Sequence, residues 1–256
     1  MPRNVAIGLG LMEFPFDGVS GYWRWVDLCE AGGIDSLWQT DRMVSREPIL
    51  ECMSVMAALA GRTRRLKFGV NVVSLAFRDP VLVAKQCATI DVLSEGRLLP
   101  AFGIGSPLAP EWRTLNLDTK TRGRKTDEGL EIIGRLWRED QVDFDGVHYH
   151  LSGASIAPKP VQPDLPMWIG GSSEAAIRRT ARFGTGWQAG EQRRLLKSGQ
   201  SLPASAPLPP PRGGRLTTII TAPASRSALA GPTIPVSAGC SKPTANAPGA
   251  IPCAIS

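Results

Sequence analysis

Residues 66–104, LKFGVNVVSLAFRDPVLVAKQCATIDVLSEGRLLPAFGI, contain the pattern that decides the fold. A β-branched run at 66–73 predicts a strand, and the apolar run at 98–104 predicts a second one. Between them, Asp79-Pro80 is typical of the capped start of a helix, which we expect to continue through Leu93. Two strands joined by a helical crossover pair in parallel, so this stretch predicts one unit of a parallel α/β fold.

The same alternation of strand and helix extends in both directions from this unit. The further predicted strands are 5–11, 34–39, 166–169 and the start of one at 186–189. The further predicted helices are 21–31, 50–59, 126–137 and 174–183, and a hairpin is predicted for 142–144 and 147–150 around Asp145-Gly146. Regular alternation leaves two α/β architectures, a doubly wound sheet and a (β/α)₈ barrel.

The glycine patterns favour the barrel. A dinucleotide-binding doubly wound sheet needs G-x-G-x-x-G after a strand. Gly8-Leu9-Gly10 is followed by Glu13 where the third glycine belongs, and Gly103-Ile104-Gly105 also lacks it. We therefore predict an α/β fold of the TIM type, a (β/α)₈ barrel that is incomplete because only about six strands precede residue 190.

The distribution of charged residues differs between two parts of the chain, which we call the body (1–190) and the tail (191–256). The body holds 22 Lys and Arg against 22 Asp and Glu, so the tail carries the whole formal net charge of +6. A neutral body is a poor electrostatic footprint for nucleic acid. No apolar stretch approaches a membrane span, the N-terminus does not resemble a signal peptide, and the five cysteines form no C-x-x-C pair. We expect a cytoplasmic protein without a membrane partner.

The tail differs from the body in composition. It contains 11 prolines and no Phe, Trp or Tyr, which predicts disorder because little apolar surface is available for burial. One hypothesis is a Pro-rich interaction segment. The other is a frameshift near residue 190, since a one-base shift of codons for 217–228 can encode Asp-Asp-Asp-His-Tyr-Gly-Ala-Gly-Phe-Pro-Phe-Arg, a string typical of a barrel strand and its loop.

Five stretches in order carry a resemblance to a known family. They are 33–42 (GIDSLWQTDR), 68–72 (FGVNV), 79–97 with its TIDVLSEGR end, 158–162 (PKPVQ), and 169–173 with 184–187 (IGGSS and GTGW). Together they resemble the luciferase-like monooxygenases. The resemblance implies a flavin-dependent oxidoreductase or monooxygenase that oxidises a small organic substrate with reduced flavin and O₂. FMN is the expected cofactor and a deazaflavin the alternative.

Asp41 and Arg42 are the candidate catalytic residues, because they follow the second predicted strand and barrel enzymes place their chemistry on such loops. An arginine there can hold an anionic substrate or the charge of a reduced flavin near its N1. The structural alternative is an ion pair between Arg42 and Asp41. Many relatives carry His at the position of Arg42, which argues against general-base chemistry by this residue.

The candidate cofactor residues lie at the ends of later strands. The resemblance implies a non-proline cis peptide at Asn71-Val72 beneath the flavin ring, with an ordinary strand end as the alternative. Glycines followed by a helix start favour a phosphate site, although Ser173 can equally be a simple cap. The full predicted set is Asn71, Val72, Gly103, Gly105, Gly170, Gly171, Ser172, Ser173 and Trp187.

Other residues are given structural roles. Arg97 is expected to pair with a helix end at the opposite face of the barrel. His148 and His150 share one hairpin face but have no third ligand nearby, so no metal site is predicted. Partners implied by the resemblance are the small-molecule substrate, O₂, a flavin reductase and a second copy in a homodimer. A non-enzymatic flavin-binding protein and an inactive gene product are the competing interpretations.

Overall fold

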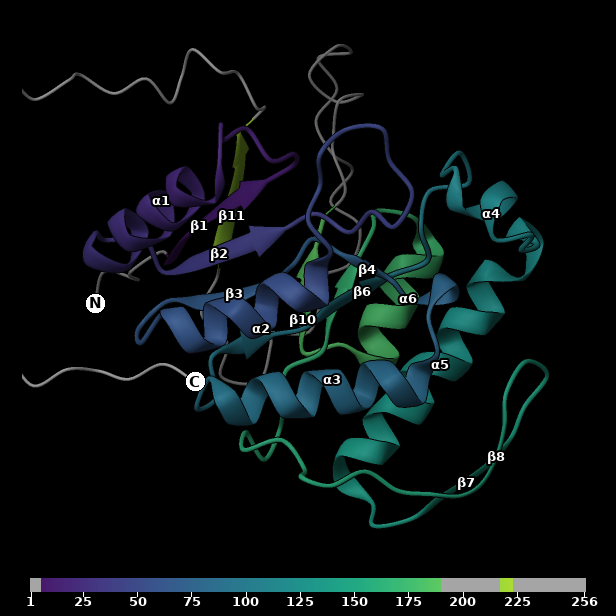
Figure 1. Ribbon diagram of the computed structural model, residues 1–256. Coiled ribbons are helices and arrows are strands. Elements are labelled where there is room, and N and C mark those ends of the chain that lie inside the picture. The colour runs from purple at the N-terminus through teal and green to yellow at the C-terminus, as the bar shows by residue number, and fades with distance from the viewer. Residues whose placement is uncertain (1–5, 190–216, 223–256) are drawn as a thin grey trace, which may run out of the picture. The chain divides into compact units, whose positions relative to one another are not determined.

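The computed structural model describes residues 6–189 and 217–222. Its strands are β1 (Ala6–Leu11), β2 (Ser36–Gln39), β3 (Lys67–Val70), β4 (Val73–Ser74), β5 (Leu98–Leu99), β6 (Ala101–Gly103), β7 (Val142–Asp145), β8 (His150–Ala154), β9 (Trp168–Gly170), β10 (Gly186–Gln188) and β11 (Thr217–Ala222). Its helices are α1 (Val19–Ala31), α2 (Cys52–Arg62), α3 (Pro80–Leu93), α4 (Glu111–Thr114), α5 (Arg122–Arg138) and α6 (Glu174–Phe183), with short 3₁₀ turns η1 (Leu75–Phe77) and η2 (Thr119–Thr121) (Figure 1).

The strands follow one another in space in the order in which they occur in the chain. One sheet has the order β11-β1-β2-β3-β5 and the other has the order β10-β9-β6-β4, and every pair in both is parallel. β3 and β4 are one strand interrupted at 71–72, and β5 and β6 are one strand interrupted at Pro100. A doubly wound sheet reverses its order at a switch point, so this sequential order confirms the barrel-type architecture.

The strand β11 differs from the expectation for the tail. The composition of 191–256 predicts no regular structure, yet Thr217–Ala222 pairs in parallel with β1 over six residues, from Ala6 opposite Thr217 to Leu11 opposite Ala222. Its sequence TTIITA is β-branched, which fits a strand even without aromatic residues. The rest of the predicted tail, 191–216 and 223–256, lies outside the described residues. The frameshift hypothesis is a statement about the gene and stays a prediction.

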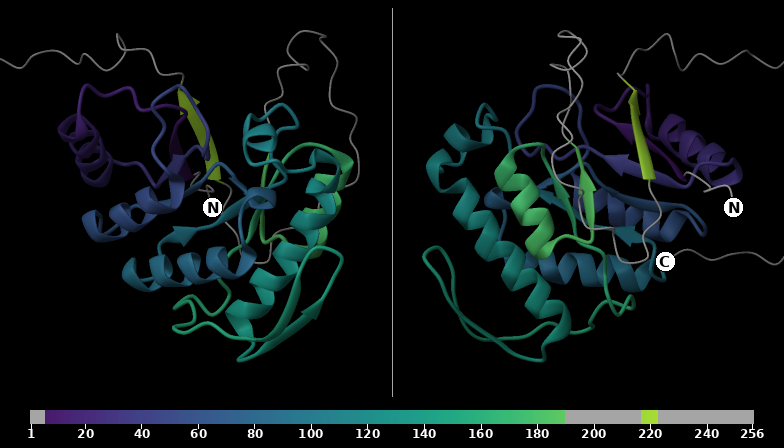
Figure 2. Two further views of the ribbon diagram at one scale, coloured as in Figure 1. Left: turned by 45° about the vertical axis from the view of Figure 1, so that its right-hand side comes forward. Right: turned by 180° about the vertical axis from the view of Figure 1, so that it is seen from behind.

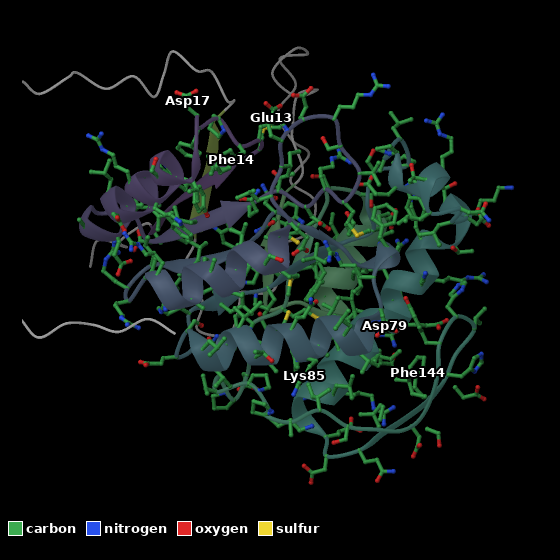
Figure 3. The ribbon with its side chains drawn as sticks, in the orientation of Figure 1. Glu13, Phe14, Asp17, Asp79, Lys85 and Phe144 are labelled. Atoms are coloured by element: carbon green, nitrogen blue, oxygen red, sulfur yellow. The ribbon has the colours of Figure 1, made fainter. Side chains whose placement is uncertain are left out.

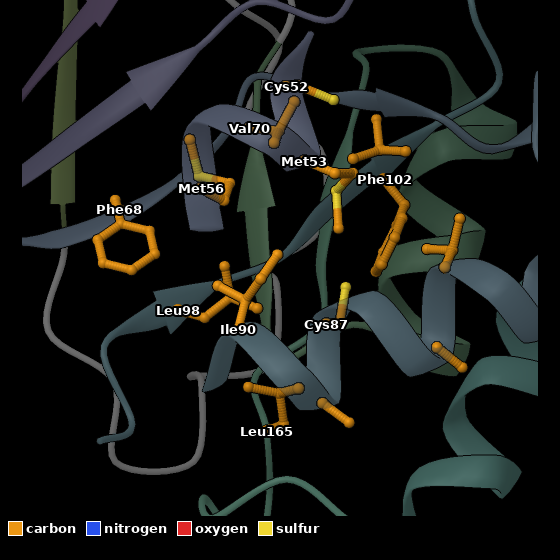
Figure 4. Close-up of a cluster of buried hydrophobic side chains, with 14 of the residues drawn as sticks. Cys52, Met53, Met56, Phe68, Val70, Cys87, Ile90, Leu98, Phe102 and Leu165 are labelled. Carbon is orange, nitrogen blue, oxygen red and sulfur yellow. The ribbon is translucent and has the colours of Figure 1, made fainter. Parts of the chain in front are cut away.

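Helices cover the outer face of the strands (Figures 1 and 2). The core between the helices and the strands is apolar. The close-up in Figure 4 shows its central part, around α2, α3 and the strands from β3 to β6. Fully buried members include Met56 of α2, Phe68 of β3 and Phe102 of β6. Burial of side chains of this size stabilises the fold by about 1.5–3 kcal/mol each. Cys29, Cys52 and Cys87 are buried and unbridged, and burial raises the pKa of the Cys87 thiol to about 12.

On the inner face of the strands, tryptophan side chains pack against glycines. Trp38 of β2 is 2% exposed, donates from Nε1 to Ser36 Oγ at 2.9 Å, and lies 5.5 Å from the ring of Trp168. A Cβ on Gly69 of the neighbouring strand would lie 2.6 Å from the Trp38 ring, and a Cβ on Gly8 would lie 2.7 Å from its Nε1. The glycines on both sides of β2 thus make the space that the indole occupies, as in a packed barrel interior.

The predicted helices and strands agree with the structure except at some boundaries. Asp79 accepts from the Leu82 amide at 2.9 Å and begins α3 as predicted (Asp79 is labelled in Figure 3). The helix predicted for 126–137 begins four residues earlier, at Arg122. The second hairpin strand begins at His150 instead of residue 147, because the Glu128 carboxylate accepts from the amides of residues 147–149 and holds them in a turn.

Arg97 has the structural role that the sequence predicts. Its guanidinium donates to the carbonyls of Ala60 and Thr63 at the end of α2, each at 2.9 Å, and to the Leu66 carbonyl at 2.9 Å. The last carbonyls of a helix have no partners within the helix, so a partly buried cation there satisfies them. Because Leu66 immediately precedes β3, this contact lies at the N-terminal ends of the strands, opposite the face expected to carry the chemistry.

Candidate functional site

The C-terminal ends of four strands bring most of the predicted cofactor residues together. The peptide bond between Asn71 and Val72 is cis, as the family resemblance implies. The Val72 side chain packs directly on two glycines, because a Cβ on Gly103 would lie 2.6 Å from Val72 Cγ2 and a Cβ on Gly170 would lie 2.8 Å from Val72 Cγ1. Larger residues at either glycine would displace Val72. These two glycines therefore support Val72 rather than leaving open space for a ligand.

The loop after β9 has the geometry of a helix start. Gly171 has φ +116°, a conformation that favours glycine, and its amide donates to the Gln188 carbonyl at 3.0 Å. Ser173 is the N-cap of α6 and accepts from the Ala176 amide at 3.2 Å. Trp187 donates from Nε1 to the Gly171 carbonyl at 2.7 Å. The cap interpretation of Ser173 is therefore present in the structure, and Trp187 braces the loop.

The remaining predicted cofactor residues lie close to the same loops. Gly105 follows β6 with φ +74°, and a Cβ there would lie 3.3 Å from the Phe77 ring. Ser172 lies between Gly171 and the N-cap of α6. Both therefore belong to loops that follow strands, on the face where barrel enzymes carry their sites.

Gln188 is a residue that the sequence analysis missed. It ends β10 opposite Gly170, it is 6% exposed, and neither its Oε1 nor its Nε2 has a hydrogen-bond partner in the described part of the chain. A buried carboxamide without partners is costly, about 1–3 kcal/mol, and marks a place where a ligand can supply the missing donor and acceptor. No sequence signal identifies it, because a glutamine after a short strand is ordinary.

Asp41 and Arg42 are neighbours in sequence but point in different directions. The Asp41 side chain is 3% exposed, and its carboxylate accepts from the Ser74 amide at 2.8 Å and from Arg78 Nη2 at 2.6 Å. Arg78 also pairs with Glu51, the N-cap of α2, at 3.2 Å. The alternative of an Asp41–Arg42 ion pair is therefore wrong, because the cation beside Asp41 is Arg78.

Arg42 faces a different carboxylate. Its Nη1 lies 3.8 Å from Glu111 Oε2, and its side chain is 38% exposed while that of Glu111 is 2% exposed. Glu111 Oε1 accepts from the amides of Met43 and Val44 at 3.1 and 3.2 Å. The sequence analysis did not single out Glu111, since it begins the four-residue helix α4, more than sixty positions from Arg42. Of the two candidate catalytic residues, Arg42 is the one accessible to a ligand.

The charges beneath this face form one cluster, in which Asp41 and Arg78 are largely buried and Glu51 is 41% exposed. Burial alone would lower the pKa of Arg78, but the carboxylates of Asp41 and Glu51 raise it above the usual value. Burial and the nearby Asp41 charge raise the pKa of the Cys52 thiol, whose Sγ lies 3.4 Å from Asp41 Oδ1. Cys52 is therefore a protonated thiol and a poor nucleophile. The cluster ties the loop after β2 to the start of α2 and to the segment after β4.

A groove of about 240 Å³ lies elsewhere, between α5 and α6. Met167 and Thr185, which line it, precede β9 and β10, so the groove lies at the N-terminal ends of the strands. It therefore does not belong to the strand-end site. Among residues 6–189 and 217–222, no cluster of His, Cys, Asp and Glu side chains could hold a metal ion, and none of the helices is long and apolar enough to cross a membrane.

Comparison with known proteins identifies the family. The family model described as luciferase-like monooxygenase matches residues 17–205. The chain belongs to the luciferase-like monooxygenase family. The match covers well over half of the chain and ends a little beyond the predicted body. This finding confirms the resemblance drawn from the five sequence stretches.

Relatives in the family include proteins that use a deazaflavin. The chain is 35% identical over 145 residues to an uncharacterized protein of Mycobacterium tuberculosis, covering 56% of this chain and 49% of that protein. It is 30% identical over 171 residues to an F420-dependent glucose-6-phosphate dehydrogenase of Amycolatopsis mediterranei, covering 62% of this chain and 49% of that enzyme. The chain thus spans about half the length of these curated relatives.

Solved structures of the family share the fold. The monooxygenase RslO1 of Streptomyces bottropensis matches with a TM-score of 0.64 at 22% identity, covering 70% of this chain and 57% of that chain. The coenzyme F420-dependent tetrahydromethanopterin reductase of Methanopyrus kandleri matches with a TM-score of 0.62 at 19% identity, covering 72% and 55%. Another match is an oxygenating constituent of 3,6-diketocamphane monooxygenase from Pseudomonas putida in complex with FMN. Relatives therefore include both F420 and FMN proteins.

Proposed function

We propose that this chain binds FMN or the deazaflavin F420 at the C-terminal ends of β3, β6, β9 and β10, and oxidises a small organic substrate. One observation carries the proposal beyond family membership. Val72 packs on Gly103 and Gly170, and opposite Gly170 lies the carboxamide of Gln188, which has no hydrogen-bond partner among the described residues. The polar edge of a flavin presents both hydrogen-bond donors and acceptors. These are the partners that the Oε1 and Nε2 atoms of Gln188 lack among the described residues.

The chemistry divides between cofactor and protein. A bound reduced flavin supplies hydride transfer or O₂ activation, and a bound deazaflavin supplies hydride transfer. The residues of this chain would bind and orient the cofactor. Val72 would support the ring, Gln188 would hydrogen-bond to its polar groups, and Arg42 would offer positive charge to a reduced ring or an anionic substrate. Amides at the start of α6, beside Gly171 and Ser172, suit a phosphate. Asp41 acts as a positioning residue, because its oxygens already accept from Ser74 and Arg78.

The identity of the cofactor is open to direct measurement. The sequence favours FMN, while the names of relatives at 30–34% identity favour F420. We propose titrating the purified protein with each one, following flavin or F420 fluorescence. Saturable binding of either supports the proposal. Absence of binding to both contradicts it.

A substitution at Gln188 links the binding to the site. Gln188→Leu removes the buried amide and should weaken cofactor affinity by roughly five- to a hundredfold, which corresponds to about 1–3 kcal/mol. The same change should stabilise the cofactor-free protein toward urea, because an unsatisfied polar group is replaced by an apolar one. Gln141→Leu, at an exposed position, is the matched control and should change neither property.

A measurement of turnover distinguishes an enzyme from a protein that only binds the cofactor. With FMN, we propose measuring O₂ uptake while a flavin reductase supplies reduced FMN, against the same mixture without the protein. With F420, we propose following its absorbance after adding glucose 6-phosphate, because related proteins carry the name of that dehydrogenase activity. Cofactor binding without either reaction would favour a flavin-binding protein. The substrate, the use of O₂, a homodimer and a cytoplasmic location remain part of the proposal.

A further inference from the structure

Glu111 joins two loops of the face that carries the proposed site. It is the first residue of α4, in the segment after β6, and its Oε1 accepts from the amides of Met43 and Val44 in the loop after β2. Its Oε2 is buried and makes no hydrogen bond within the described residues. The guanidinium of Arg42 lies near that oxygen, with Nη1 at 3.8 Å.

The backbone that carries Glu111 is firmly held. The next residue, Trp112, is 5% exposed and donates from Nε1 to the Ser106 carbonyl at 2.7 Å. Its ring lies edge-on to Phe77 of η1, with the ring centroids 4.4 Å apart. Ala76 and Ala109 complete this small apolar cluster. Because the cluster anchors α4 to the segment after β4, the Glu111 carboxylate is a fixed point on the face.

The arrangement of Glu111 is unusual for a purely structural carboxylate. A buried carboxylate is costly unless both oxygens are hydrogen-bonded or paired at close range. Glu111 satisfies one oxygen fully, whereas Arg42 is attracted to the other without hydrogen-bonding to it. The Arg42 guanidinium therefore keeps its donors for another group while the Glu111 charge restricts where it lies.

We infer that Glu111 is a positioning residue that acts through Arg42. Oε1 holds the loop after β2 in place, and the charge on Oε2 directs the guanidinium so that it can meet an anionic group bound at the strand ends. The inference rests on the proposed function, in which a reduced flavin ring with negative charge lies near Arg42. It assigns to Glu111 no direct contact with cofactor or substrate.

A double-mutant cycle tests this inference. Glu111→Gln keeps an acceptor for the amides of Met43 and Val44 but removes the charge, and Arg42→Gln removes the guanidinium. The measured quantity is the ratio of the dissociation constants of oxidised and reduced FMN, obtained by anaerobic fluorescence titration. Positioning predicts that Glu111→Gln lowers the preference for reduced FMN by about two- to fivefold, the value of a partly exposed ion pair, when Arg42 is present. No decrease is expected in the Arg42→Gln background.

The sign of the change distinguishes positioning from simple electrostatics. If Glu111 acted only as a nearby negative charge, its removal would strengthen binding of the anionic reduced ring. An increase, no change, or an equal decrease in both backgrounds would overturn the inference. Glu128→Gln is the matched control, because Glu128 also accepts from backbone amides, at residues 147–149, but lies away from Arg42. It should leave the ratio unchanged.

Amide hydrogen exchange tests the same residue without any flavin. Peptides that contain Met43 and Val44 should exchange faster in Glu111→Ala than in the wild type, while Glu111→Gln should stay close to the wild type. Equal exchange in all three proteins would overturn the inference. Failure to bind both FMN and F420 would instead contradict the proposed function, and the exchange result would then decide by itself whether Glu111 holds the loop.

Discussion

Arg78 offers the sharpest test of how the loops of the candidate site are held. Its side chain is 11% exposed, and Nη2 lies 2.6 Å from an oxygen of Asp41, which is 3% exposed. Arg78→Met keeps most of the apolar stem but removes the charge. The Asp41 carboxylate then keeps the Ser74 amide and a weak thiol donor but loses its cationic partner. An uncompensated buried charge is among the most destabilising features that a substitution can create.

The magnitude follows from burial, and a second ion pair in the chain provides the comparison. Removal of one partner from a buried pair costs about 3–5 kcal/mol. Arg62 and Asp27 also lie 2.6 Å apart, but their side chains are 49% and 50% exposed. Exposed pairs of this kind contribute little to stability because water screens both charges. Arg62→Met should therefore cost several-fold less free energy of unfolding than Arg78→Met, although the two distances are equal.

Equilibrium unfolding in urea, followed by tryptophan fluorescence, measures both variants under the same conditions. The double variant Asp41→Asn with Arg78→Met adds the decisive comparison. Because Asp41→Asn removes the unpaired charge, we expect the double variant to be more stable than Arg78→Met alone. Equal losses for Arg78→Met and Arg62→Met, or strictly additive losses at positions 41 and 78, would refute the argument that burial makes this pair important.

Two further predictions concern the fold and its pH dependence. Gly69→Ala should lower the free energy of unfolding by about 3 kcal/mol or more, because the new Cβ would overlap the Leu99 carbonyl oxygen. Gly61→Ala in α2, where a Cβ meets nothing within 4 Å, should instead raise the free energy of unfolding by about 0.5–1 kcal/mol. The reverse order of the two variants in urea unfolding would contradict the packing argument. Three backbone amides at 64–66 lower the pKa of Glu30 although burial opposes them, so its contribution is present above the unfolded pKa of about 4.3 and is lost as pH falls through the folded pKa. Glu30→Gln should therefore lose less stability than the wild type between about pH 5 and pH 3, which acid titration of the urea midpoint would show.

The order of elements could be predicted from the sequence because each carries a local signal. Asp79-Pro80 starts α3, and the glycine pair Gly32-Gly33 ends α1, so the alternation that defines a parallel fold is visible without tertiary information. The interruptions within strands were less visible. Pro100 divides β5 from β6, and residues 71–72 divide β3 from β4, although each pair belongs to one predicted strand. Strand β11 escaped prediction because its partner, β1, lies more than two hundred residues away in the chain.

The sequence predicted only those residues of the candidate site that lie next to the C-terminal ends of strands. Residues next to strands, such as Val72 and Gly170, follow from the fold, because parallel strands present their C-terminal ends together. Gln188 and Glu111 do not follow from it. Their significance comes from burial and from polar atoms without a hydrogen-bond partner in the described part of the chain, and neither property is encoded in the neighbouring sequence. The same limit explains why an ion pair between Asp41 and Arg42 stood as the structural alternative in the sequence, whereas the folded chain places Arg78 against Asp41.

The loops of the site face are held mainly by carboxylates that accept from backbone amides. Asp41 binds the Ser74 amide, Glu51 binds the first amides of α2, and Glu111 binds the amides of Met43 and Val44. Such contacts fix loop positions without large apolar side chains, which would fill the space that a cofactor needs. They also place negative charge beneath the face, and Arg78 neutralises part of it from below. Arg42 is the partly exposed cation beside Glu111. Asp41 and Arg42 are adjacent in sequence, but the Asp41 carboxylate holds the loops while the Arg42 guanidinium stays accessible to a ligand.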